Sequence, residues 1–157
     1  MHPIPVHKTI VRVDAEGAVL SRRRSPKRGT ALDVFSELVS IPGFITHPGF
    51  QVHLALTVEE EYRKHDPTKA WRRRGWVVVE RRLVEVEDVI EITGASDLRA
   101  LLPNDLPEPF TTSDIAIAAG CPRRVAQQMA YCLRHSEAIR EVGRRGNAIE
   151  YRMTLHL

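Results

Sequence analysis

Apolar and polar residues alternate over several segments of the N-terminal half, which is the pattern of half-buried β-strands. Residues 8–14 (KTIVRVD) alternate in this way, and a turn at residues 15–17 followed by residues 18–21 completes a predicted hairpin. Apolar stretches at residues 51–58 and 75–92 predict further strands. The N-terminal half is therefore expected to contain a β-sheet.

One helix is expected between these strands, because apolar residues recur there at helical spacing. They are Leu32, Phe35, Leu38 and Val39. Pro42 and Gly43 end this helix, and its apolar face is expected to pack on the sheet. The preceding residues 22–30 (RRRSPKRGT) predict a basic loop. The predicted N-terminal domain, residues 1–94, is thus a β-rich α+β domain with one main helix.

A second domain is predicted over residues 95–157, which makes the whole chain α+β. Ser96 is expected to cap a short helix at residues 97–102. Residues 101–109 (LLPNDLPEP) contain three prolines and predict an extended connection. The domain boundary is placed at Gly94, ahead of this helix.

A helix-turn-helix follows the connection. Thr111 or Thr112 caps its first helix, which Gly120 ends in a left-handed conformation. Pro122 then opens a longer helix that continues to about His135, because a first-turn proline loses no hydrogen bond. The tight turn between the two helices predicts the helix-turn-helix arrangement.

The longer helix is expected to have an inward stripe and an outward polar face. The stripe consists of Val125, Met129, Cys132 and Leu133. The outward face carries side chains that can pair with bases or hold phosphate: Arg123, Arg124, Gln127, Gln128, Tyr131 and Arg134. The helix has no carboxylate before Glu137, which favours a polyanionic partner.

A hairpin is predicted after this helix, with strands at residues 139–142 and 148–153. Arg144 and Arg145 are expected at its tip, between Gly143 and Gly146.

These signals together resemble the winged helix-turn-helix superfamily of bacterial and archaeal DNA-binding proteins. The resemblance covers about the last 48 residues and rests on Thr111, Thr112, Asp114–Ala116, Gly120, Pro122–Arg124, Leu133, Ala138, Ile139 and residues 143–146. It implies that residues 122–135 are the recognition helix. It also implies that Arg144 and Arg145 form a wing that contacts the nucleic acid backbone or minor groove. Some members of the superfamily are protein-interaction modules instead.

Composition bounds the class of protein. With 157 residues, 43% hydrophobic and 27% charged, the chain is expected to fold as two small globular domains sharing a core. It contains no apolar run long enough for a membrane span, and residues 1–8 lack the apolar core of a signal peptide. A cytoplasmic protein without a membrane partner is expected.

Positive charge is clustered although the net charge is only +3. Clusters in the N-terminal domain are expected to extend a nucleic-acid footprint. They are Arg22, Arg23, Arg24, Lys27 and Arg28, and Arg72, Arg73 and Arg74. Trp71 and Trp76 flank the second cluster, either as a base-stacking platform or, in the interpretation we favour, as core anchors.

No metal, cofactor or catalytic residue is predicted. Cys121 and Cys132 lie eleven positions apart in a helical pattern, too far for a disulfide, and are expected to be reduced core thiols. With His135 they lack a fourth zinc ligand at metal-like spacing. Glu37 and residues 59–61 loosely suggest a restriction-endonuclease-like site, but no Glu-x-Lys motif completes it, and residues 59–61 are expected to begin a turn or helix.

The function predicted from the sequence is therefore nucleic-acid binding, to duplex DNA first, without catalysis, as in a transcriptional regulator or a DNA-processing accessory factor. A metal-dependent nuclease with a restriction-endonuclease-like N-terminal domain and a winged-helix protein-interaction adaptor are the alternatives. The N-terminal domain is also a candidate for homodimerisation or for binding a protein partner.

Overall fold

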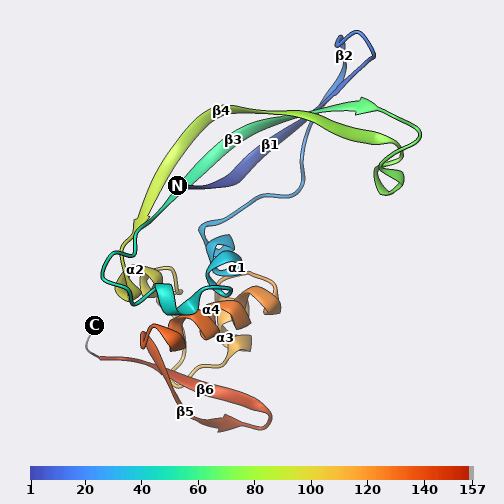
Figure 1. Cartoon of the computed structure of the whole chain (residues 1–157). Coiled ribbons are helices and arrows are strands. Elements are labelled where there is room, and N and C mark those ends of the chain that lie inside the picture. Colours follow the sequence, from blue (N-terminus) through green and yellow to red (C-terminus); the bar gives the residue numbers. More distant parts are fainter. Residues whose placement is uncertain (156–157) are drawn as a thin grey trace. The chain divides into compact units, whose positions relative to one another are not determined.

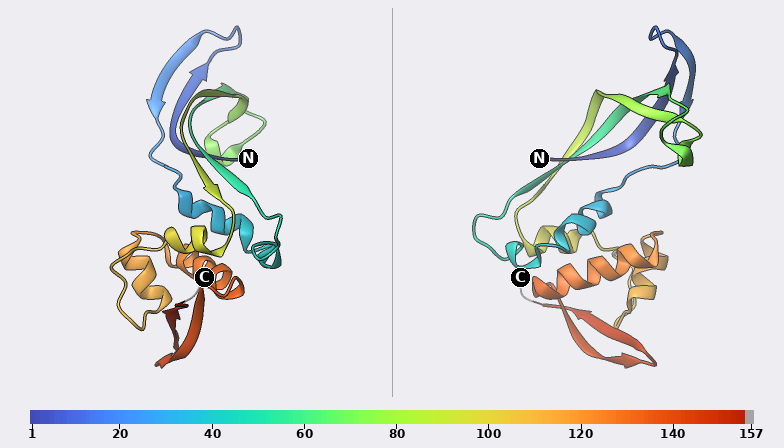
Figure 2. Two further views of the ribbon diagram at one scale, coloured as in Figure 1. Left: turned by 90° about the vertical axis from the view of Figure 1, so that its left-hand side faces the viewer. Right: turned by 45° about the vertical axis from the view of Figure 1, so that its right-hand side comes forward.

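The computed structural model describes residues 1–155 and shows a mixed α+β chain (Figures 1 and 2). The chain divides into two compact units. The sheet unit comprises residue 1 and residues 3–30 and 55–90, and the helical unit comprises residue 2, residues 31–54 and the chain from residue 91 onward. Each unit is described separately below.

The sheet unit contains most of a four-stranded sheet with the strand order β2-β1-β3-β4. Its strands are β1 (His2–Val13), β2 (Val19–Arg24), β3 (Val52–His65) and β4 (Trp76–Ile92). Strands β1 and β2 form the predicted antiparallel hairpin, whose turn is fixed by Asp14. The Oδ1 atom of Asp14 accepts hydrogen bonds from the backbone N–H groups of Glu16 and Ala18, at 3.0 and 2.8 Å.

Two segments that were predicted to lie outside strands, residues 22–24 and residues 59–61, belong to strands β2 and β3. Arg22, Arg23 and Arg24 lie in β2 opposite Val11, Ile10 and Thr9, since β1 is long enough to offer backbone partners to all three. The basic loop starts only after β2 ends. The three glutamates at residues 59–61 lie within β3 and do not begin a turn or helix.

The tryptophans differ from each other, and the prediction that both anchor the core is wrong. Trp71 is 82% exposed and lies in the 3-10 helix η3 (Trp71–Arg73) between β3 and β4. Trp76 is half-buried, and its ring contacts the Arg12 guanidinium and the edge of His65. Only Trp76 therefore packs against the sheet unit.

The helical unit contains four α-helices among the described residues and a two-stranded sheet (Figure 1). Its α-helices are α1 (Val34–Leu38), α2 (Ala95–Ala100), α3 (Thr112–Ala118) and α4 (Arg123–His135). The 3-10 helices η1 (Ala31–Asp33) and η2 (Pro42–Phe44) flank α1, and strands β5 (Ile139–Arg145) and β6 (Ala148–Met153) form an antiparallel hairpin. Fully buried side chains of the unit include Phe35, Leu98, Phe110, Ile115, Met129, Leu133 and Ile139.

Helix α1 packs against α4, a helix contact that the sequence pattern did not predict. Phe35 and Leu38 of the predicted apolar face are buried, as is Val34, which was not predicted. Leu32 and Val39 are only half-buried. The helix belongs to the helical unit. Residues 31–54 therefore join the segment that was predicted to fold as a domain from residue 95. A helix with one apolar side must bury that side against another element, and α1 and α4 do so against each other.

Helix α2 begins at Ala95, and Ser96 does not cap it. Asp97 fulfils a related role, because its Oδ2 atom accepts hydrogen bonds from the Thr93 N–H at 2.7 Å and the Thr93 hydroxyl at 2.8 Å. The predicted proline-rich connection is confirmed, since residues 103–109 contain no regular element. Over residues 1–155, no helix has the length and apolar composition needed to cross a membrane.

Candidate nucleic-acid interface

The start of α3 is fixed by a capping box. The Thr111 hydroxyl accepts a hydrogen bond from the Asp114 N–H at 3.4 Å, and the Asp114 carboxylate accepts one from the Thr111 N–H at 2.7 Å. These bonds confirm Thr111 as the predicted cap. The backbone hydrogen bond from Thr111, its hydroxyl and the charge of Arg145 lower the pKa of Asp114.

The turn between α3 and α4 also follows the sequence. Gly120 has a φ of +59°, the left-handed conformation predicted for it, and the N–H of Cys121 donates to the carbonyl of Ala116 at 3.1 Å. Pro122 lies at the N-cap of α4, one position before the first turn in which it was expected. The two helices are thus joined by the tight turn that the sequence predicts.

The inner face of α4 consists of Ala126, Met129, Ala130, Cys132 and Leu133, all buried. The predicted stripe is confirmed apart from Val125, which is half-buried. Both cysteines are free, and burial raises the pKa of Cys132 to about 11, so its thiol stays protonated and unreactive.

The outer face of α4 lines a groove of about 330 Å³ together with the hairpin. Four of the predicted binding residues line it: Arg123, Gln127, Tyr131 and Arg134. The other walls come from Thr112, Asn147, Ala148, Ile149 and Tyr151. Arg124 and Gln128, also predicted, are not among the lining residues, and Arg124 is exposed beside them.

Asn147, Ile149 and Tyr151 were not predicted as part of this surface. Asn147 forms the two-residue hairpin turn with Gly146, whose φ is +62°. Ile149 and Tyr151 share one face of β6 because side chains alternate along a strand. That alternation is visible in the sequence, but it does not show which face turns towards α4.

The arginines of this surface fall into two groups. Arg123, Arg124 and Arg144 are exposed and have no hydrogen-bond or ion-pair partner within residues 1–155. Arg134 instead forms an ion pair with Glu141 on β5. Arg144 and Arg145 also end β5 opposite Ile149 and Ala148, so the prediction that they form the hairpin tip is wrong.

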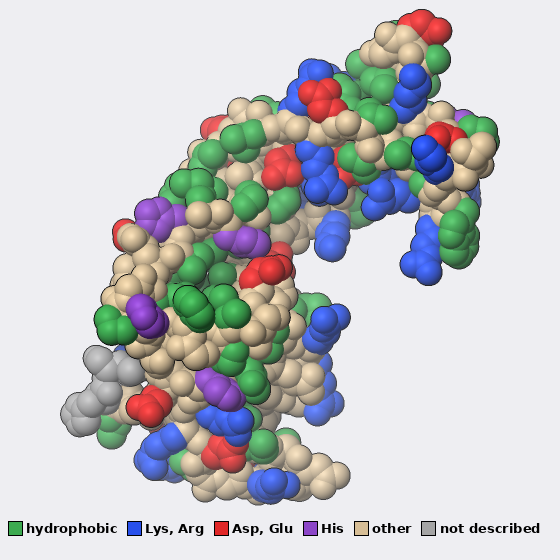
Figure 3. All heavy atoms as spheres, viewed as in Figure 1, with side chains coloured by type: hydrophobic (Ala, Val, Ile, Leu, Met, Phe, Trp, Pro, Cys, Tyr) green, Lys and Arg blue, Asp and Glu red, His purple; other side chains and the backbone are tan. Residues whose placement is uncertain are grey.

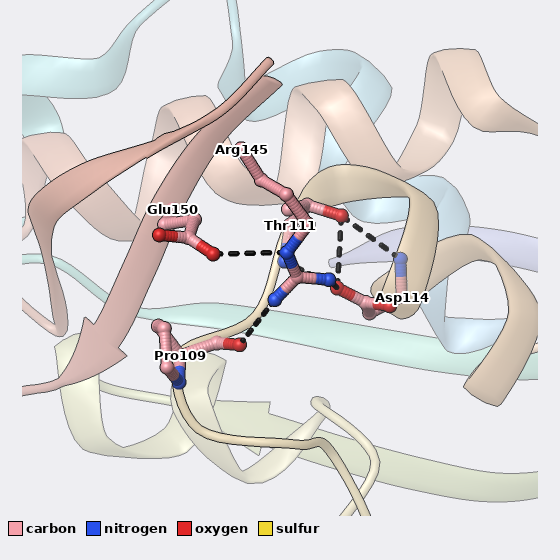
Figure 4. Close-up of polar contacts among 5 residues, drawn as sticks. All are labelled: Pro109, Thr111, Asp114, Arg145 and Glu150. Carbon is pink, nitrogen blue, oxygen red and sulfur yellow. Dashed lines mark hydrogen bonds and ion pairs between the residues drawn. The ribbon is translucent and has the colours of Figure 1, made fainter. Parts of the chain in front are cut away.

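Arg145 is held by three internal contacts (Figure 4). Its Nε donates to Glu150 at 2.9 Å, its Nη2 donates to the carbonyl of Pro109 at 3.1 Å, and its Nη1 lies 3.6 Å from the Asp114 carboxylate. Arg145 therefore links the hairpin to the capping box of α3. A side chain with these partners is less available to a ligand than Arg144.

The other predicted binding residues lie in the sheet unit and form separate candidate surfaces. Arg22 is paired with Glu60, and the Arg72 guanidinium lies 5.2 Å from the Trp71 ring. The remaining ones are exposed and lack ion-pair partners within residues 1–155: Arg23, Arg24, Lys27, Arg28, Arg73 and Arg74.

The acidic residues considered for a nuclease site lie on different elements. Among residues 1–155, no three His, Cys, Asp or Glu side chains converge as metal ligands. Glu37 lies on α1 in the helical unit. In the sheet unit, Glu60 pairs with Arg22, and Glu61 pairs with Lys8, Arg63 and Arg81. Burial would raise the pKa of Glu61, but the hydrogen bond from Arg63 and the charges of Arg63, Lys8 and Arg81 outweigh it and lower that pKa.

Comparison with known proteins identifies relatives without an assigned activity. An "Uncharacterized protein" of Treponema pallidum (strain Nichols) is 24% identical over 116 residues, which is 74% of this chain and 46% of the relative. The chain thus spans about half the length of that curated relative. No solved structure matches the chain. The family model described as "Domain of unknown function (DUF8091)" matches residues 1–93, more than half of the chain, and the chain therefore belongs to this family.

Proposed function

We propose that the segment from α2 to β6 is a winged helix-turn-helix module that binds double-stranded nucleic acid, duplex DNA first. The observation that carries the proposal is the groove in which the outer face of α4 meets the β5–β6 hairpin. In a winged helix these two elements contact the ligand, and here both contribute side chains to one surface.

The chemistry of the surface supports this assignment. Arg123 in the groove can donate two hydrogen bonds to a guanine edge or contact phosphate, and the Gln127 amide can donate one bond to an adenine edge and accept one from it. Arg124 and Arg144 are exposed cations without internal partners and can contact phosphate. Contacts of this kind would serve a transcriptional regulator or a DNA-processing accessory factor.

The experiment is a titration of a labelled duplex at several salt concentrations. Each phosphate contact contributes about 0.9 to the slope of log K against log salt. The double variant Arg123→Ala/Arg124→Ala should therefore weaken binding and reduce the slope by up to about two. Arg140→Ala is the matched control, because Arg140 is exposed on β5 but does not line the groove. Equal slopes for the double variant, the control and the unmodified protein would reject the proposal.

A protein-interaction adaptor is the second candidate, and the ion pairs of Arg134 and Arg145 favour it. They leave part of the surface with mixed charge, which suits a polypeptide ligand better than a polyanion. An adaptor would show no salt-sensitive affinity for duplex DNA in the same titration. The sheet unit then becomes the candidate for a homodimer or protein contact.

A further inference from the structure

The loop between β3 and β4 presents an indole ring to solvent. Trp71 is 82% exposed, and Lys69, Arg72, Arg73 and Arg74 surround it in the sequence. The space-filling view shows hydrophobic atoms beside Lys and Arg side chains at this end of the β3–β4 hairpin (Figure 3). We call residues 66–75 the Trp71 loop.

This loop has a defined backbone. Asp66 and Gly75 close it, since the N–H of Asp66 donates to the Gly75 carbonyl at 2.7 Å. The N–H of Arg73 donates to the Ala70 carbonyl at 2.7 Å, which forms the 3-10 turn that carries Trp71. A buried aromatic side chain removes about 150–250 Å² of surface from water, and Trp71 loses most of this stabilisation by remaining exposed. An exposed indole on such a fixed turn therefore suggests a ligand that stacks on it.

We propose that the Trp71 loop binds single-stranded nucleic acid, with an unpaired base stacked on Trp71 and phosphates held by Arg73 and Arg74. The Arg72 guanidinium lies over the indole, 5.2 Å from the ring centroid, and the opposite ring face is left to a base. Arg73 and Arg74 are exposed and have no ion-pair partner within residues 1–155. Aromatic rings beside unpaired cations form the general chemistry of single-strand binding.

A membrane surface also binds tryptophan and basic side chains, but it fits the Trp71 loop less well than single-stranded nucleic acid does. Trp71 is the one large exposed hydrophobic side chain described in the loop, and its neighbours Lys69 and Arg72–Arg74 are all charged. Interfacial membrane binding increases with the apolar area inserted, and a single indole supplies little. A ligand with both phosphates and ring faces matches the loop more completely.

The proposal rests on the proposed function only for its substrate class, a nucleic acid that has unpaired as well as paired segments. Single-strand binding at the Trp71 loop involves residues of the sheet unit only, and duplex binding involves residues of the helical unit only. Each proposal can therefore fail while the other stands. If Arg123→Ala/Arg124→Ala leaves duplex affinity unchanged while Trp71→Ala weakens single-strand affinity, the winged-helix proposal fails and this one stands. The reverse result rejects only the Trp71 loop.

The experiment uses the full chain with labelled oligo-dT and oligo-U, followed by anisotropy and by intrinsic tryptophan fluorescence. Oligonucleotide should quench the emission of Trp71, and the tighter of the two ligands indicates DNA or RNA. Trp71→Ala should weaken binding about 10- to 100-fold, the range for loss of one stacked base. Trp71→Phe should retain most of the affinity but lose the quenching, because Trp76 is then the remaining indole.

Phe44→Ala is the matched control, because Phe44 is also an exposed aromatic residue but lies in η2 of the helical unit. It should bind oligonucleotides like the unmodified chain. Far-ultraviolet circular dichroism checks that each variant is folded. Unchanged oligonucleotide affinity in Trp71→Ala would overturn the proposal. So would a blue shift of Trp71 emission with anionic phosphatidylglycerol vesicles but no response to either oligonucleotide, which would assign the loop to a membrane surface.

Discussion

Two adjacent arginines of β5 offer a test that separates folding from binding. Arg145 contacts Glu150, Asp114 and the carbonyl of Pro109, whereas Arg144 has no partner within residues 1–155. Exposed ion pairs contribute about 0.2–1 kcal/mol each, and the Arg145 side chain is 55% exposed. The three contacts together should therefore contribute about 1 kcal/mol. Arg145→Ala should lower Tm by about 2–4 °C for a chain of this size.

Arg144→Ala should leave stability unchanged and alter nucleic-acid binding instead. Its removal costs no internal contact, so Tm should stay within about 1 °C of the unmodified value, as for other surface substitutions. If Arg144 contacts a phosphate, the salt slope of duplex binding should fall by about 0.9. Arg145→Ala should change that slope little at a temperature where both variants are folded.

The assays are thermal unfolding and duplex titration between about 50 and 200 mM salt. The variant Glu150→Gln is a useful companion, because it weakens one Arg145 contact without removing the arginine. A Tm unchanged in Arg145→Ala would show that the three contacts do not stabilise the hairpin. Equal losses of salt slope in the Arg144 and Arg145 variants would show that both contact phosphate, and the division into free and engaged arginines would be refuted.

Two further predictions concern stability. Gly75→Ala should destabilise the protein by about 1–3 kcal/mol in chemical denaturation, because φ is +81° and a Cβ would lie 2.8 Å from His65 Nε2 and 3.1 Å from the Asp66 carbonyl. Gly17→Ala is its control, with a φ of +93° but no neighbour within 4 Å, and a loss as large as that of Gly75→Ala would contradict the clash. Asp114→Asn should lower Tm more at neutral pH than at about pH 2.5. The lowered pKa of Asp114 gives stability that is present above its ordinary pKa and is lost as pH falls through the folded value, so an equal Tm difference at both pH values would exclude this contribution.

Local signals explain what could be predicted from the sequence. The capping threonine, Gly120 and the apolar stripe of α4 act within one or two turns of helix, and the structure contains these features close to their predicted positions. The hairpin after α4 is likewise specified by alternation and a glycine at its turn. Such features depend on neighbours a few residues away and are therefore legible in the sequence.

Interactions between distant residues explain what could not be predicted. Arg145 donates to a carbonyl 36 positions earlier in the sequence, and α1 packs against a helix that begins at residue 123. Tertiary packing determines both partners, and the periodicity of apolar residues does not show which distant segment a side chain contacts. The three consecutive glutamates of β3 were misread for a related reason, because the basic residues that neutralise Glu61 come partly from β1 and β4.

Internal pairing also changes what the positive surface can do. The helical unit presents five predicted binding arginines, which would give a salt slope of about −4.5 if each contacted a phosphate. Arg134 and Arg145 are paired with carboxylates, and the three unpaired ones predict a slope of about −2.7 instead. A phosphate that displaced Glu141 from Arg134 would leave that carboxylate beside the nucleic acid, and the repulsion would offset the attraction between Arg134 and the phosphate. The available charge is therefore set by Arg123, Arg124 and Arg144, and a clustered arginine counts towards binding only where the fold leaves it without a partner.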